Sequence, residues 1–216
     1  MKPPDIVKKL KSKGQSPQSL ITIETFEGIK GYLRPVQANR KIAAQMAKWR
    51  TGNFDAFFTW IKPIENDLFQ WLKRYEDIDN DIVFIIELPT GVSIGQIALY
   101  SIDFYQKAAE IGRIIKGEKE CPEGIMTLAA EALVRWGFGC LKLEKIFLEV
   151  FADNERAISL YKKLGFHVSD MLLFRRTRTP QGLVQWVRVK KGRETSYKHQ
   201  YREVCEMTLQ RKDLRV

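Results

Sequence analysis

A tyrosine on the apolar face of a short predicted helix is the residue of this chain best placed for chemistry. Residues 154–166 read Asn-Glu-Arg-Ala-Ile-Ser-Leu-Tyr-Lys-Lys-Leu-Gly-Phe. Tyr161 lies one helical turn after Ala157 and one turn before Leu164, on the face that the spacing predicts to be buried. A phenol there either satisfies its hydroxyl with a hydrogen bond in the core or gives a proton to a reacting group. Packing explains the apolar stripe, but it gives no reason for the polar tip.

The helix that carries this tyrosine has sequence signals at both ends and follows an apolar run at 146–152. Asp153 or Asn154 can accept hydrogen bonds from the free N–H groups of the first turn. Gly165 stands where a left-handed residue would end the helix. The pattern N-x-x-A-x-x-x-Y-x-x-x-G-F after a buried strand closely resembles the cofactor-proximal segment of the GNAT superfamily of acyl-CoA N-acyltransferases.

This resemblance implies an acetyl-CoA-dependent N-acetyltransferase in which the acceptor amine attacks the thioester directly. Acetyl-CoA is then the co-substrate. No metal is expected, because the chain has only two histidines and no metal-type cysteine spacing. Tyr161 matches the tyrosine that protonates the leaving thiolate, and a phenol with an ordinary pKa of about 10 suits that role. The positions that match the family's pantetheine-binding residues are Arg113, Ile114, Ile115, Asn154 and Ala157.

The segment expected to hold the pyrophosphate of the cofactor departs from the family pattern. Residues 118–124 join a predicted strand to a predicted helix, whose first N–H groups and dipole can bind an anion. The family loop usually reads Gln/Arg-x-x-Gly-x-Gly/Ala, whereas this chain reads Cys-Pro-Glu-Gly-Ile-Met-Thr from position 121. Either the backbone still binds the pyrophosphate, or cofactor binding has been lost. The candidate backbone donors are Gly124, Ile125, Met126 and Thr127.

A base is also expected, because the acceptor amine must be neutral to attack. Glu110 is the first candidate, since it opens a predicted strand and matches a family position near the acceptor. An exposed charge at a strand end is the alternative interpretation. Glu149 lies inside an otherwise apolar strand and is a weaker candidate, because a paired structural carboxylate explains it equally well. His167, directly after the Gly-Phe pair, is a third and poorer choice.

The front half of the chain resembles two GNAT branches, one that acetylates amino-sugar nucleotides and one that acetylates the N-termini of ribosomal proteins. Trp49 could stack on a sugar or base, and Arg50 could pair with a phosphate or carboxylate. Equally, Trp49 could pack into the core while Arg50 lies on the surface.

Charge guides the choice of acceptor. The net charge is +10, and residues 171–216 carry +8 of it, from twelve Lys or Arg against four Asp or Glu. This favours an anionic small-molecule acceptor, first an amino-sugar nucleotide, and disfavours a small polyamine. A protein N-terminus on the ribosome is the second possibility, where positive charge would help docking on RNA. A non-catalytic GNAT-like module with an anionic partner is the third.

The elements that position these residues predict an α/β fold with a mixed, mostly antiparallel central sheet, flanking helices and splayed central strands, as in GNAT enzymes. We expect a weakly ordered leader at 1–18 and a single domain at 19–216 with a basic C-terminal region at 171–216. The composition and three unpatterned cysteines indicate a cytoplasmic protein without a membrane span, and a homodimer is possible. Strands are predicted within 21–37 and at 81–88, 92–100, 110–117, 145–151, 166–177, 183–189 and 204–210, and helices at 38–50, 64–75, 125–140 and 154–164.

Overall fold

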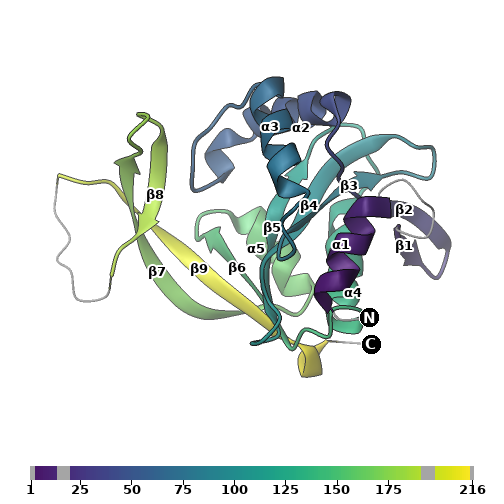
Figure 1. Ribbon diagram of the computed structural model, residues 1–216. Coiled ribbons are helices and arrows are strands. Elements are labelled where there is room, and N and C mark those ends of the chain that lie inside the picture. The colour runs from purple at the N-terminus through teal and green to yellow at the C-terminus, as the bar shows by residue number, and fades with distance from the viewer. Residues whose placement is uncertain (1–2, 14–19, 191–197, 215–216) are drawn as a thin grey trace.

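The chain folds around one long sheet, as a computed structural model of residues 3–13, 20–190 and 198–214 shows (Figure 1). The described strands form a nine-stranded sheet in the order β1-β2-β3-β4-β5-β6-β9-β7-β8. Only β5 and β6 pair in parallel. The predicted fold class is therefore confirmed.

The elements are α1 (Pro3–Lys13), β1 (Ile21–Thr25), β2 (Gly28–Pro35), α2 (Arg40–Gly52), η2 (Phe54–Ala56), α3 (Glu65–Tyr75), β3 (Ile82–Glu87), β4 (Ser93–Asp103), β5 (Ala108–Lys116), α4 (Ile125–Gly139), β6 (Lys145–Phe151), α5 (Glu155–Lys163), β7 (His167–Arg178), β8 (Val184–Arg188), β9 (Tyr201–Gln210) and η3 (Arg211–Asp213).

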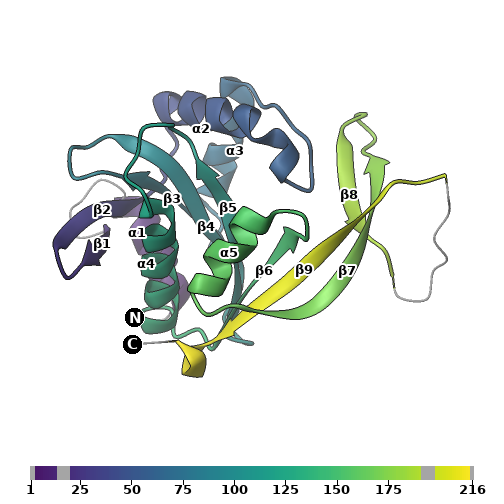
Figure 2. The ribbon, with the colours of Figure 1, turned by 180° about the vertical axis from the view of Figure 1, so that it is seen from behind.

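Helices cover both faces of the sheet, so its central strands are apolar on both sides. In β3, Phe84 and Ile86 join the core under α4 and α5, whereas Val83 and Ile85 join the core under α2 and α3. This is why residues 82–86 read as an unbroken apolar run and not as an alternating one. Figures 1 and 2 show α2 and α3 on one side of the sheet and α4 and α5 on the other.

Strands β5 and β6 run side by side for only a short distance and then separate. Their pairing begins at Ala108 with Lys145 and ends at Glu110 with Phe147. Just beyond, β5 bulges against β4, and Arg113 takes a left-handed φ of 50°. The facing edges of the two strands are then free of each other, which opens the middle of the sheet.

The C-terminal part of the chain completes the sheet beyond β6. Strand β9 lies between β6 and β7, and β7 continues into a hairpin with β8 that extends away from the body (Figure 2). The loop after α2 meets this hairpin: the N–H of Trp60 donates to the carbonyl of Val184 at 2.8 Å, and that of Trp186 to the carbonyl of Phe58 at 2.7 Å. The α2–α3 loop thus borders the far side of the opening.

The N-terminal segment corrects the expectation of a weakly ordered leader. Residues 3–13 form α1, in which Val7 is fully buried in the core beneath α4. The ammonium of Lys11 donates to the carbonyls of Tyr75, at 2.8 Å, and Ile78. The lysine-rich composition suggested solvation, but one face of the helix is apolar and the stem of Lys11 is buried with it. Residues 14–18 lie outside the described part of the chain.

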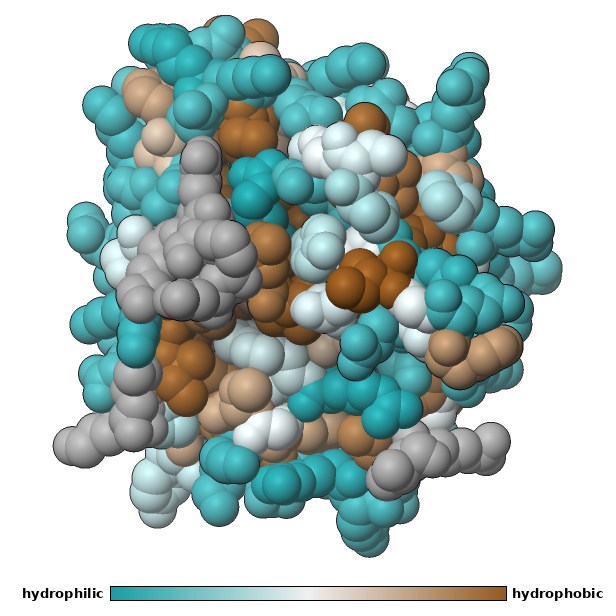
Figure 3. All heavy atoms as spheres, turned by 90° about the vertical axis from the view of Figure 1, so that its right-hand side faces the viewer, coloured by the Kyte–Doolittle hydropathy of each residue, from teal (hydrophilic) through white to brown (hydrophobic). Residues whose placement is uncertain are grey.

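The side of the molecule that carries β1, β2 and α1 has apolar side chains near its middle and hydrophilic ones around them (Figure 3). On the β1–β2 hairpin, Phe26 is 99% exposed and Ile29 is 50% exposed. In the described ranges, no helix combines the length and the apolar character needed to cross a membrane.

Candidate active site

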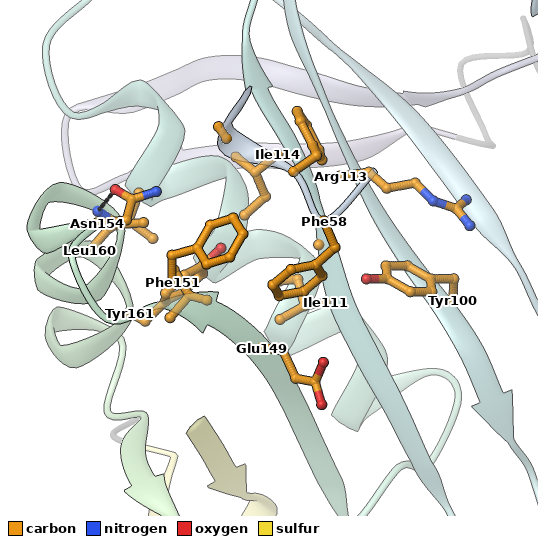
Figure 4. Close-up of a pocket in the computed structure, with 15 residues that line it drawn as sticks. Phe58, Tyr100, Ile111, Arg113, Ile114, Glu149, Phe151, Asn154, Leu160 and Tyr161 are labelled. Carbon is orange, nitrogen blue, oxygen red and sulfur yellow. Dashed lines mark hydrogen bonds between the residues drawn. The ribbon is translucent and has the colours of Figure 1, made fainter. Parts of the chain in front are cut away.

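A cavity of about 190 Å³ occupies the opening between β5 and β6 (Figure 4). Strands β4, β5 and β6, helix α5 and the α2–α3 loop contribute its walls, so it collects side chains from distant parts of the sequence. Its lining residues are Ala56, Phe57, Phe58, Tyr100, Ile111, Gly112, Arg113, Ile114, Glu149, Val150, Phe151, Asn154, Ala157, Leu160 and Tyr161.

Tyr161 lines this cavity from α5. The helix begins at its N-cap Asn154, whose Oδ1 accepts from the N–H of Ala157 at 3.1 Å (Figure 4). It is followed by Gly165 in a left-handed conformation with φ 92°. Tyr161 is 8% exposed, and its hydroxyl has no hydrogen-bond partner among the described residues. Burial, with a smaller effect of Glu110, raises its pKa, so the hydroxyl keeps its proton at neutral pH.

Glu110 lies next to the cavity but does not line it. Its Oε1 accepts from the hydroxyl of Tyr100 at 2.6 Å, and Tyr100 itself lines the cavity. Burial raises the pKa of Glu110 above its usual value, while the bonds to Tyr100 and the charge of Arg113 act in the opposite direction. Tyr100 was missed from the sequence. What links Tyr100 to the site is its position directly across from Glu110 on the neighbouring strand. That position can be found only when the pairing register of β4 and β5 is known.

Glu149 lines the cavity from β6 and points into the space between the two strands (Figure 4). Burial first, and then the nearby charge of Glu110, raise the pKa of this carboxyl group. The guanidinium of Arg188 lies 3.9 Å away and favours the charged form. His167 does not join this cluster: it is exposed at the start of β7, and its Nε2 lies 3.3 Å from the hydroxyl of Thr208.

Arg113 connects the cavity to the framework behind it. Its guanidinium binds both carboxylate oxygens of Asp81, at 2.8 and 2.9 Å, and lies over the ring of Tyr100. Its carbonyl accepts from the side-chain amide of Gln96 at 3.3 Å. Ile114 lines the cavity beside it, whereas Ile115 is buried on the α2–α3 face. Arg113 and Ile114 thus lie on the open edge of β5.

The predicted pyrophosphate loop forms a turn that leads into α4. Gly124 caps the helix in a left-handed conformation with φ 76°. The N–H of Ile125 donates to the carbonyl of Pro122 at 3.4 Å, and that of Thr127 to the carbonyl of Gly124 at 2.9 Å. Two of the predicted anion donors are therefore used within the turn. The N–H groups of Gly124 and Met126 have no such backbone partner in the described part of this turn.

A second cavity of about 530 Å³ adjoins the first, and Arg50 lines it. The Nη2 of Arg50 donates to the carbonyl of Thr59 at 2.6 Å, and its guanidinium lies 3.5 Å from the ring centre of Phe57. Trp49 lines neither cavity. It is 1% exposed, and its Nε1 donates to Glu118 at 2.8 Å, so it belongs to the core beneath α2. The burial of Trp49 favours the packing interpretation of that residue.

Known proteins resemble this chain over most of its length. Residues 32–167 match the acetyltransferase (GNAT) domain family. The spermidine N(1)-acetyltransferase of Escherichia coli (strain K12) is 37% identical over 141 residues, which cover 65% of this chain and 70% of that protein. A spermidine N(1)-acetyltransferase of Vibrio cholerae serotype O1 is 26% identical over 149 residues, 68% of this chain and 79% of that protein.

Two further similarities are to a putative ribosomal N-acetyltransferase and to a crystal structure. The putative ribosomal N-acetyltransferase YdaF of Bacillus subtilis (strain 168) is 29% identical over 96 residues, which cover 44% of this chain and 51% of that protein. The crystal structure of spermidine N-acetyltransferase from Vibrio cholerae in complex with CoA and spermine superposes with a TM-score of 0.65 at 18% identity, covering 84% of this chain and 96% of that one. The splayed β5–β6 pair, the capped α5 and these matches together place this chain in the GNAT family of acetyl-CoA-dependent N-acetyltransferases.

Proposed function

We propose that the cavity between β5 and β6 is where a primary amine takes the acetyl group of acetyl-CoA, with Tyr161 as the proton donor. The amine nitrogen attacks the thioester carbon, and the carbon–sulfur bond then breaks with its electron pair leaving on sulfur. Tyr161 supplies the proton that the thiolate takes up. The observation that carries this role is the position of the phenol, which lines the cavity between β5 and β6 from α5.

The open edge of β5 fits the pantetheine arm of acetyl-CoA. From Ile111 to Ile114 the strand has no partner on the β6 side, because the pairing with β6 ends at Glu110. Its backbone groups on that side can therefore bond to the amides of the arm, much as an added strand would. Asn154 and Ala157 form the opposite wall from α5. We assign pyrophosphate binding to the turn at Gly124, with the N–H groups of Gly124 and Met126 as its donors.

Two carboxylates could prepare the amine for attack. Glu110 acts through Tyr100, because the Tyr100 hydroxyl lies between this carboxylate and the cavity. Glu149 faces the cavity itself and can receive the ammonium form of the acceptor. A carboxyl group with a raised pKa is a better base at neutral pH than an exposed one. We assign proton removal to Glu110 and initial contact with the amine to Glu149.

The acceptor is a small-molecule primary amine. Spermidine is the acceptor named for two of the relatives, which makes a polyamine the first compound to assay. The preference for an amino-sugar nucleotide rested on net charge and on the resemblance of the front half of the chain, and the relatives give it no support. A protein N-terminus has one supporting observation, the likeness to the putative ribosomal N-acetyltransferase.

Titration calorimetry with acetyl-CoA, followed by thiol release with a panel of amines, tests the proposal. We expect micromolar acetyl-CoA binding and turnover with at least one small primary amine. The panel contains spermidine, an amino-sugar nucleotide and an N-terminal peptide, so that each acceptor class is represented. Acetyl-CoA binding without turnover of any amine would contradict the proposed reaction. Absence of binding would contradict the assignment of the β5 edge.

A further inference from the structure

The second cavity lies between α2, α3 and the sheet, and it opens beside the first one. Phe57, Phe58 and Arg113 line both cavities, so a molecule that reacts in the first can extend into the second. At about 530 Å³ the second cavity has room for a sugar or a comparable group. Its lining residues are Met46, Arg50, Phe57, Phe58, Thr59, Ile61, Pro63, Asp67, Leu68, Trp71, Arg74, Gln96, Arg113 and Ile115.

The charged residues of this lining are three arginines and one aspartate. Arg113 is paired with Asp81. Neither Arg50 nor Arg74 has a carboxylate within 4.0 Å in the described ranges of the chain. The carboxylate of Asp67 accepts from the N–H of Ile64 at the start of α3. The local balance is therefore positive, and it is set by the cavity itself and not by the basic C-terminal region.

Arg50 is half-buried at the edge of this cavity, and one of its donors lacks a partner among the described residues. Its guanidinium is surrounded by Phe57 and the carbonyl of Thr59, and its buried Nη1 has no hydrogen-bond partner in the described structure. Burial lowers the pKa of Arg50 to about 10, so the group is still charged at neutral pH. A buried donor without a partner costs free energy. The Nη1 atom itself is shielded, so a ligand in the cavity would contact this atom only after a shift of the guanidinium.

These charges separate two kinds of acceptor. The second ammonium group of a polyamine would meet like charges in this cavity, in surroundings where burial weakens screening. A phosphate or carboxylate would meet planar donors that match its geometry. The apolar part of the lining, including Trp71 and Leu68, would contact the body of the molecule.

We propose that the second cavity binds an anionic group, a phosphate or a carboxylate, carried by the same molecule whose amine reacts in the first cavity. This inference rests on the proposed function and specifies its acceptor. It also separates this chain from its relatives, because their named acceptor is a polycation. Arg74 and Arg50 supply the positive charge, and Arg113 lies at the junction of the two cavities.

Matched pairs of amines test the proposal on the full chain. Glucosamine and glucosamine 6-phosphate differ by a phosphate, and hexylamine and 6-aminohexanoate differ by a carboxylate. We would measure the Kd of each by calorimetry in the presence of CoA, and kcat/KM with acetyl-CoA, with spermidine as the cationic comparison. We expect the anionic member of at least one pair to bind about tenfold tighter or better, and the pair that responds identifies the anion.

Arg74→Gln removes a charge from the cavity rim, and Lys73→Gln removes one from the neighbouring position of α3, outside the lining. We expect the advantage of the anionic amine to be lost in Arg74→Gln and kept in Lys73→Gln. Arg50→Lys provides a second variant that keeps the charge but loses the planar donor set.

Equal binding within both pairs, or no binding of either anionic amine, would overturn the proposal. So would tight spermidine binding that improves in Arg74→Gln. Turnover of spermidine alone would leave the proposed reaction standing while removing the anionic acceptor. Loss of all turnover would instead contradict the proposed reaction, and the binding measurements would still decide the role of the second cavity.

Discussion

The proton donor and the candidate base are close enough to influence each other's ionisation. Glu110 raises the pKa of Tyr161, in addition to the larger effect of burial. Tyr100, which donates to Glu110, also has a raised pKa, chiefly because it is buried. Both phenols therefore stay protonated at neutral pH while the two carboxyl groups titrate above their usual range. The two tyrosines are therefore the proton donors of the site, and the two carboxylates are the groups that can take up a proton.

Tyr161→Phe separates catalysis from cofactor binding. Without the hydroxyl the thiolate must take its proton from water, so we expect kcat to fall by about 10²-fold or more. Acetyl-CoA affinity should stay unchanged, because the ring still fills the wall of the cavity. Steady-state kinetics and calorimetry on the same variant measure the two quantities. Unchanged turnover would remove Tyr161 from the reaction.

The pH dependence of kcat/KM reports on Glu110. The base must be ionised, so activity rises with pH through the pKa of Glu110, which burial places above its usual value. The Tyr100 hydroxyl stabilises the charged form by donating to it. We expect Tyr100→Phe to lower kcat/KM, because the hydroxyl that links Glu110 to the cavity is lost, and to move the acidic limb of the remaining activity to higher pH. Tyr105→Phe, which alters a 90% exposed tyrosine, is the matched control and should leave the limb in place.

The same profile distinguishes the two carboxylates. Glu110→Gln should abolish the acidic limb if this residue removes the proton. If the limb survives in Glu110→Gln and disappears in Glu149→Gln, the assignments of the two residues must be exchanged.

Among the elements, α2 packs unusually closely on the end of β5. The ring of Trp49 lies against Gly117, where an added Cβ would be 2.1 Å from Trp49 Cε2. Trp49 is buried there and donates to Glu118, the next residue. The contact fixes α2, and therefore Arg50, relative to the strand that carries Arg113. Packing therefore requires a glycine at position 117, although the backbone there has no positive φ that would itself favour glycine.

Gly117→Ala should lower the free energy of unfolding by about 1–3 kcal/mol, because the indole ring cannot yield without moving the helix. Gly52→Ala, where an added Cβ meets nothing within 4 Å, is the matched control and should be neutral within about 0.5 kcal/mol. Urea unfolding of the two variants measures the difference. Equal stability would mean that Trp49 can repack.

Much of the element order was predictable from the sequence, because local signals specify it. The helix from Glu155 to Lys163 was predicted from its N-cap and from Gly165, and α4 from its apolar spacing. The pairing register was not predictable in the same way, so Tyr100 went unnoticed beside Glu110. Helix α1 was missed because its stability comes from packing against the rest of the molecule. The second cavity combines residues from four elements and the α2–α3 loop, which no local pattern reveals.

At the scale of the molecule, net charge alone does not describe the surroundings of the acceptor. The chain carries +10 overall, yet Glu149 lines the first cavity and arginines line the second. Charges on the outer surface are screened within about 8–10 Å. The groups that select an acceptor are therefore those a few ångströms from it.

The buried Lys11 makes global stability depend on pH in alkaline conditions. Burial lowers its pKa from 10.5 to about 8 in the folded chain. Between these values the unfolded chain binds a proton that the folded chain has released, so the free energy of unfolding rises with pH. We expect Lys11→Met to remove this rise and Lys9→Met, an exposed lysine of the same helix, to retain it. Urea unfolding from pH 7.5 to 10.5 gives the comparison, and parallel curves for all three proteins would contradict the assignment.

The insertion of β9 beside β6 has a consequence for the order in which the chain can fold during its synthesis. Strand β6 forms three residue pairs with β5 but seven with β9, from Lys145 with Gln210 to Phe151 with Val204. Until residues 201–210 have left the ribosome, the whole β9-facing edge of the strand that bears Glu149 is unpaired. The nascent chain therefore exposes an unpaired strand edge while more than fifty further residues are translated. Such an edge can pair with other chains, so we expect chaperones to bind the nascent chain most strongly in that interval.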